Sequence, residues 1–163
     1  MGLDLYISKK IFIGAMYESC GITGEIHLFK HGKEIPVVLE NVSCVIEQIY
    51  HGHKTWWLLE WLNRELDGVL SGDGEDHEIS REVLTALCRG CSAVLRHKGK
   101  QDFNAVCKAH LGCQVRENID KESLGFFLQD IQGLKEGIET GCDLHGLCLL
   151  VKLQGASPRA LQG

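Results

Sequence analysis

The sequence predicts an α+β fold, in which a small, mainly antiparallel sheet is packed by about three helices. Two observations lead to this prediction. Segments with alternating or β-branched residues fill the N-terminal third of the 163-residue chain, whereas amphipathic stretches with helical spacing follow from residue 54 onwards. An apolar run at residues 147–153 then predicts a last strand, which we expect to rejoin the N-terminal strands.

The first strand follows from a two-residue period at the N-terminus. In residues 3–8 apolar and polar side chains alternate, as in a strand with one buried face, and residues 11–13 continue the segment with β-formers. Residues 42–49 are rich in β-branched side chains and predict a further strand.

A β-hairpin is predicted between these strands. Residues 25–30 and 34–39 are two short β-rich arms, and they flank a turn at residues 31–33 that contains Gly32. Pro36 removes a backbone donor from the second arm, so this arm is expected at the edge of a sheet.

Three amphipathic segments predict the helices, at residues 54–66, 80–97 and 121–139. Ser80 and Asp120 each stand immediately before one of these segments, where their side chains are suited to cap a helix N-terminus. Each segment carries apolar residues three and four positions apart, which predicts one face turned towards the sheet.

The segments between and beyond the helices are predicted to be irregular. Residues 72–78 are acidic and polar, and we expect a solvated loop there. We expect residues 1–154 to form a single domain, followed by a short tail at residues 155–163 that is rich in Gly, Ser and Pro.

Charge and composition limit the classes of function. The chain has 17 Lys and Arg against 22 Asp and Glu, which gives a formal net charge of -5. Such an acidic domain has no bulk attraction for nucleic acid or for anionic lipid, and no apolar run is long enough to span a bilayer. Because no secretory signal is recognised, a cytoplasmic location and eight reduced cysteines are expected.

The cysteines and histidines suggest a zinc site. Cys88 and Cys91 are two residues apart, as are Cys107 and His110, and the separation of the two pairs is typical of zinc sites. The alternative is core packing, because Cys88 and Cys91 also fall on the apolar stripe of the second predicted helix. A similar cluster follows at Cys142, His145 and Cys148.

Two histidines and an aromatic helix are further candidates. His51 and His53 precede the first predicted helix, where they either coordinate a metal or are exposed loop residues. Trp56 and Leu59 lie off the apolar stripe of that helix and are candidates for a partner-binding surface, unless another element of the chain covers them. We recognise no catalytic motif and assign no catalytic residue.

The opening residues carry a resemblance. Residues 1–6 read Met-Gly-Leu-Asp-Leu-Tyr, which resembles a family of small, uncharacterised bacteriophage and prophage proteins that begin Met-Gly-Leu-Asp-Met-Tyr-Leu. Lys9-Lys10 with the following strand, the hairpin at residues 21–33 and the Trp-rich helix at residues 56–61 are similar in outline to that family. The final run at residues 147–153 is aliphatic, whereas the family often has an aromatic strand there. The resemblance implies a phage-type accessory protein in the cytosol of a host cell.

Three functions are therefore open on sequence grounds. The first is a non-enzymatic protein that binds a host protein and in this way inhibits a host defence. The second is a zinc-stabilised domain, binding or catalytic, that uses Cys88, Cys91, Cys107 and His110. The third is a protein that sequesters a small molecule such as a nucleotide signal.

Overall fold

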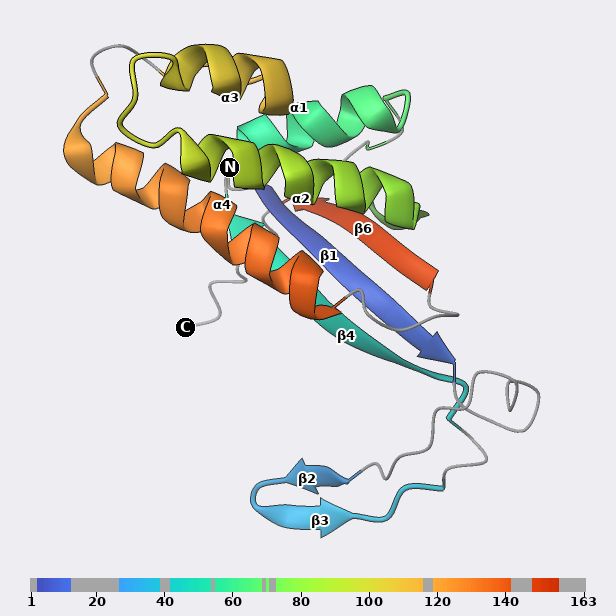
Figure 1. Cartoon of the computed structure of the whole chain (residues 1–163). Helices are drawn as coiled ribbons and strands as arrows, with labels where there is room; N and C mark the ends of the chain where they lie inside the picture. The colour runs from blue at the N-terminus through green and yellow to red at the C-terminus, as the bar shows by residue number, and fades with distance from the viewer. Residues whose placement is uncertain are drawn as a thin grey trace.

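The computed structural model describes residues 3–12, 27–38, 42–53, 55–68, 70, 73–115, 119–141 and 148–155. Its elements, in chain order, are β1 Leu3–Phe12, β2 Leu28–Lys30, β3 Lys33–Ile35, β4 Cys44–His53, α1 Trp56–Glu65, β5 Asp73–Glu78, α2 Arg81–Arg96, α3 Phe103–Leu111, α4 Lys121–Gly141 and β6 Cys148–Gly155. Figure 1 shows the helices gathered on one side of a sheet, so the predicted α+β fold is confirmed.

The main sheet is antiparallel and has the strand order β4-β1-β6-β5. β1 lies inside it and pairs with β4 on one side and β6 on the other, so the last strand rejoins the N-terminal strand as predicted. Leu5 and Ile7 of β1 are buried against the helices, whereas Asp4, Tyr6 and Ser8 on the other face are only half-buried. The alternation in the sequence therefore matches the two faces of the strand.

A β-bulge interrupts the pairing of β1 with β4. Ile7 is opposite Tyr50 and Ser8 is opposite Gln48, so Ile49 is an extra residue in β4. Ile49 contacts α4, where an added Cβ atom at Gly137 or Gly141 would overlap it. A bulge changes the direction of side chains locally, and here it lets two consecutive residues of β4, Ile49 and Tyr50, both reach α4.

The prediction of a loop at residues 72–78 is wrong, because Asp73–Glu78 forms strand β5 at the edge of the sheet. The sequence lacks apolar alternation there because residues 75–78 are exposed or half-buried, so neither face of this strand needs apolar side chains. Its acidic side chains also suit an edge, because charge discourages pairing with another chain.

The helices build the core over the sheet. Fully buried leucines and isoleucines from three helices meet β1, namely Leu58, Leu62, Leu84, Leu87, Ile131 and Leu134. Ser80 and Asp120 cap α2 and α4 as predicted, accepting hydrogen bonds from the backbone N–H groups of Val83 and Ser123. Helix α3 was not predicted, because nine residues are too few for a clear helical period.

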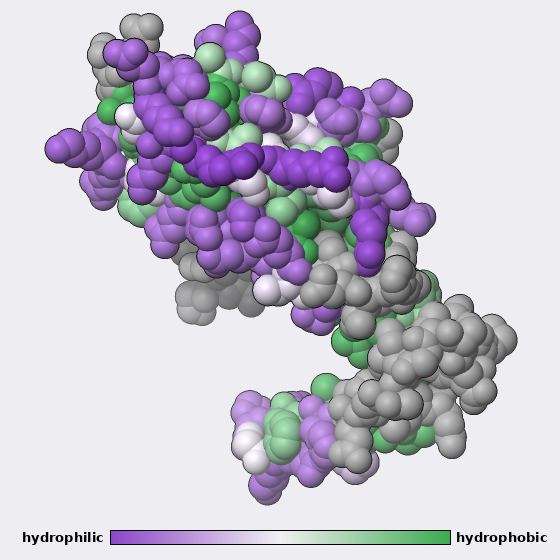
Figure 2. Space-filling view, viewed as in Figure 1, coloured by the Kyte–Doolittle hydropathy of each residue, from purple (hydrophilic) through white to green (hydrophobic). Residues whose placement is uncertain are grey.

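The predicted hairpin is confirmed, with shorter strands than expected and as a sheet of its own. His31 and Gly32 form its turn, with positive φ angles of 51° and 76°. Two consecutive positive φ angles are typical of tight hairpin turns, which favour glycine. The strand β3 ends before Pro36. Figure 2 shows that the hairpin carries both hydrophobic and hydrophilic side chains, and Phe29 is 65% exposed.

Candidate functional site

A groove of about 750 Å³ lies between β4 and α4. Its walls are residues 48–51 and 53 of β4, Thr55 and Trp57 at the start of α1, and residues 126, 127, 129, 130 and 133 of α4. Among the described residues β4 pairs with β1 alone, so its other edge has no strand partner on the side of this groove, while α4 lies against the backbone carbonyl of Ile49. The groove therefore combines an unpaired strand edge with a helix.

Asp130 is a carboxylate held within this groove by two hydrogen bonds. The Tyr50 hydroxyl donates to its Oδ1, and the Trp57 indole Nε1–H donates to its Oδ2 at 3.1 Å. These donors come from β4 and α1, so the contact joins both elements to α4. Trp57 is half-buried, with its ring against the core and its polar atom on Asp130.

The Asp130 carboxylate has two hydrogen-bond donors but no cationic partner among the described residues. Burial raises the pKa of its carboxyl group, against the opposing effect of the hydrogen bonds from Tyr50 and Trp57. Burial and the bond to Asp130 together raise the pKa of Tyr50, so this hydroxyl stays protonated and acts as a donor. Within the described part of the chain, no Lys, Arg or His side chain forms an ion pair with Asp130.

Two imidazoles lie at the same groove, and they belong to strand β4. His53 Nδ1 is 2.7 Å and His51 Nε2 is 3.5 Å from Oδ1 of Asp4, and the His51 ring stacks on Tyr6 at 4.5 Å. The alternative prediction was that both histidines are exposed loop residues. They are exposed, but they lie in a strand and not in a loop. Hydrogen bonds from His53 and His51 lower the pKa of Asp4, against a smaller effect of burial.

Aromatic side chains form the apolar part of the groove. Phe126 of α4 is 62% exposed, and Phe127 packs edge-on against Trp57 with ring centroids 6.0 Å apart. Of the two predicted partner-binding residues, Trp56 is 56% exposed, whereas Leu59 is half-buried and packs against the core. Trp56 therefore remains available as a surface residue and Leu59 is part of the packing of α1.

The predicted zinc ligands lie in different environments. Cys91 and Cys107 are buried, and burial raises the pKa of Cys91 to about 12. A hydrogen bond from Cys107 to Cys113 raises the pKa of Cys107 and lowers that of Cys113. His110 is exposed, and its backbone carbonyl accepts a hydrogen bond from Trp61.

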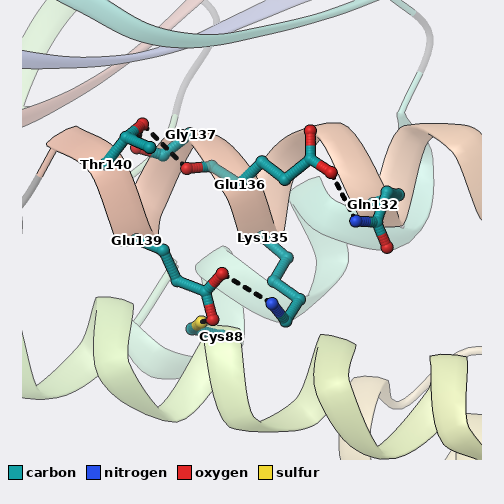
Figure 3. Close-up of polar contacts among 7 residues, drawn as sticks. All are labelled: Cys88, Gln132, Lys135, Glu136, Gly137, Glu139 and Thr140. Atoms are coloured by element: carbon teal, nitrogen blue, oxygen red, sulfur yellow. Dashed lines mark hydrogen bonds and ion pairs between the residues drawn. The ribbon is translucent and has the colours of Figure 1, made fainter.

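Cys88 is turned towards α4. Its Sγ lies 3.8 Å from Oε1 of Glu139, which also pairs with Lys135 at 2.5 Å, while Gln132, Glu136 and Thr140 form a further polar row (Figure 3). In the described segments, no group of three or more His, Cys, Asp or Glu side chains is arranged to hold a metal ion. The second cluster, at Cys142, His145 and Cys148, falls on residues or side chains outside the described part.

Gly90 allows α2 and α3, the helices that carry Cys91 and Cys107, to pack closely together. It does not break α2, which runs from Arg81 to Arg96. An added Cβ atom at Gly90 would lie 3.1 Å from the His110 carbonyl oxygen, so glycine allows α3 to approach α2 closely. The packing of α3 against α2 therefore depends on the absence of a side chain at this position.

A second, smaller hollow of about 470 Å³ lies between α2 and α4. Arg89 and Arg96 of α2 and Lys135 of α4 line it, together with Ser92 and Gln132. In a chain with a net charge of -5, this is a local concentration of positive charge.

Comparison with known proteins gives no further indication of class: no family model matches the chain, and neither a curated protein nor a solved structure matches it. Among the described residues, no helix has the length and apolar character needed to cross a membrane.

The sequence did not identify Asp130 or Tyr50 as site residues. One signal was present: Asp130 lies three residues after Phe127 and four before Leu134, beside the apolar face of α4, where a charged residue is unusual. The bulge that brings Tyr50 to it depends on the register of β1 and β4, which a single sequence does not specify.

Proposed function

We propose that this protein is a non-enzymatic binding protein that holds an extended segment of another protein in the groove between β4 and α4. The observation that carries the proposal is the open edge of β4 along this groove. β4 has ten residues and, among the described residues, its backbone is paired on one side only. An open strand edge beside a helix offers backbone hydrogen bonds to an added strand and side-chain contacts on both sides.

The exposed aromatic side chains support a protein partner. Phe126 stands over the groove with most of its ring in solvent, and Trp56 is exposed on the neighbouring helix α1. Large aromatic residues are enriched among those that contribute most to protein binding, because they bury much area at a low cost in side-chain entropy. A partner that covers both residues would remove this apolar area from water.

The nature of the partner is inferred from the resemblance of the opening residues. A phage-type accessory protein would act in the host cell, and its partner would be a host protein, for example a component of a defence system. By occupying a surface of that protein it would inhibit it without a chemical step. This part of the proposal rests on the resemblance alone.

A pull-down from host lysate with a matched pair of variants tests the proposal. Phe126→Glu places a charge in the groove, and Phe29→Glu places the same charge on the equally exposed hairpin. We expect one stoichiometric partner that wild type and Phe29→Glu retain and that Phe126→Glu loses by at least about tenfold, since a charge at the centre of an apolar contact is costly. Equal recovery with Phe126→Glu would contradict a role for the groove.

The hollow between α2 and α4 favours a second candidate, the sequestration of a small anionic molecule such as a nucleotide. The guanidinium groups of Arg89 and Arg96 match phosphate geometry, while Lys135 at the same hollow already pairs with Glu139. The same pull-down separates the two candidates, because a protein that only sequesters a nucleotide recovers no stoichiometric protein partner.

A further inference from the structure

We infer that the segment bound in the groove carries an Arg or Lys side chain, which contacts Asp130. This inference rests on the proposed function, because it specifies the chemistry of the segment. The observation behind it is a half-buried carboxylate that lines an open groove and has no cationic partner among the described residues.

The bonding capacity of Asp130 leaves room for a ligand. An ionised carboxylate accepts about four hydrogen bonds. Tyr50 and Trp57 supply two, one to each oxygen, so the carboxylate, which lines the groove, retains capacity for further donors. A charged donor from the partner would form a charge-assisted hydrogen bond there and offset the cost of burying the carboxylate.

The walls around Asp130 also suit a cation. Trp57 and Phe127 form an edge-on aromatic pair, and Phe126 is exposed beside them. A guanidinium or ammonium group is attracted to aromatic faces, most strongly to Trp, and its aliphatic stem packs on the same rings. The other titratable groups that line the groove are Tyr50, which donates to Asp130, and His51 and His53, which both lie next to the carboxylate of Asp4.

A segment bound as an extended strand can direct such a side chain towards Asp130. In an added strand, alternate side chains point to the same face, so one of them faces Asp130 while its neighbours point to the other face of the sheet. The excess of acidic residues in the chain, 22 against 17 basic ones, steers a basic segment towards it. We therefore commit to a basic, β-forming segment of a partner protein as the occupant.

The experiment uses the full chain immobilised as wild type, Asp130→Asn and Phe126→Glu. The probe is a library of short peptides with Thr, Ser, Val or Ile flanking a central Arg, citrulline or norleucine. Citrulline has the shape of Arg without its charge. Asp130→Asn removes the charge of the groove and keeps both hydrogen bonds possible, because the Tyr50 hydroxyl can turn to accept from the new amide.

On wild type we expect Arg-centred peptides to be retained about tenfold more than citrulline-centred ones, as for a partly buried charge pair. On Asp130→Asn this preference should vanish, with the fold intact by circular dichroism. Equal retention of Arg and citrulline on wild type would overturn the inference. An Arg preference that survives in Asp130→Asn would overturn it as well.

The outcome also separates this inference from the proposed function. Retention of all three peptide types on wild type, with loss of all on Phe126→Glu, would leave the groove as a peptide site and remove only the cationic side chain. Retention of no peptide, together with a natural partner that Phe126→Glu still recovers, would overturn both.

Discussion

At the scale of single residues, Asp130 links three elements and is the least compensated charge of the groove. Its side chain lies on α4 and accepts hydrogen bonds from β4 and α1. A charge in this position costs stability when the groove is empty, and it gains a partner when a cation binds. The proposed binding of a cation would account for a charge in this position.

A dependence of stability on pH follows from this burial. The pKa of Asp130 is raised in the folded protein, so between the unfolded value and the folded value the folded state binds more protons. Its favourable contribution is therefore present at low pH and is lost as the pH rises through the folded pKa. We expect the free energy of unfolding of wild type, relative to Asp130→Asn, to fall as the pH is raised from about 4.

Asp120 provides a control with the opposite sign. It caps α4, and its hydrogen bonds from the backbone and side chain of Ser123 lower its pKa. Its contribution is present above the unfolded pKa and is lost as the pH falls through the folded value. Urea unfolding of Asp130→Asn and Asp120→Asn over a pH series measures the two effects. Identical pH profiles of the free energy of unfolding for Asp130→Asn and wild type would contradict a buried carboxylate with a raised pKa.

At the scale of elements, the groove exists because α4 crosses β4 at a glycine. An added Cβ atom at Gly137 would overlap the backbone carbonyl oxygen of Ile49, the extra residue of the bulge. Backbone cannot move as a flexible side chain does, so helix and strand would have to separate. The width of the groove is therefore set by this contact.

Two alanine variants of the same helix test this contact. We expect Gly137→Ala to lower the free energy of unfolding by about 1–3 kcal/mol, as in overpacked cores. At Gly133 an added Cβ atom meets nothing within 4 Å, so Gly133→Ala should raise stability by about 0.5–1 kcal/mol through helix propensity. Thermal or urea unfolding measures both, and a neutral or stabilising Gly137→Ala would contradict the close approach.

Much of the fold at this scale could be predicted from local patterns. The alternation in β1 and the stripes and caps of α2 and α4 depend on neighbours in sequence, so periodicity was sufficient. β5 and α3 were missed for physical reasons: the acidic edge strand β5 has no apolar period, and the nine-residue α3 is held by tertiary contacts at Gly90.

The groove could not be predicted in the same way. Asp130 forms hydrogen bonds with Tyr50 and Trp57, which lie 80 and 73 positions before it in the chain. Their meeting depends on the bulge at Ile49 and on the crossing of α4, which are properties of strand register and helix packing. The sequence marked Trp56, on the neighbouring helix α1, as a candidate for a partner-binding surface, but it did not mark the carboxylate within the groove.

At the scale of the whole molecule, the described residues include two surfaces with exposed large apolar side chains. One is the groove with Phe126, and the other is the hairpin with Leu28, Phe29 and Ile35. The two differ in what they offer a partner: the groove joins an open strand edge, a helix and a carboxylate, whereas the hairpin is a sheet of only two three-residue strands. For this reason we place the partner in the groove.

Backbone amide hydrogen exchange of the protein, free and in complex with the partner that the pull-down recovers, tests this claim most directly. An added strand would protect amides of β4, and the side-chain contacts would slow exchange in the middle of α4. We predict protection in residues 44–53 and 126–133, with the hairpin unchanged. Protection confined to residues 28–35 would place the partner on the hairpin and contradict the account.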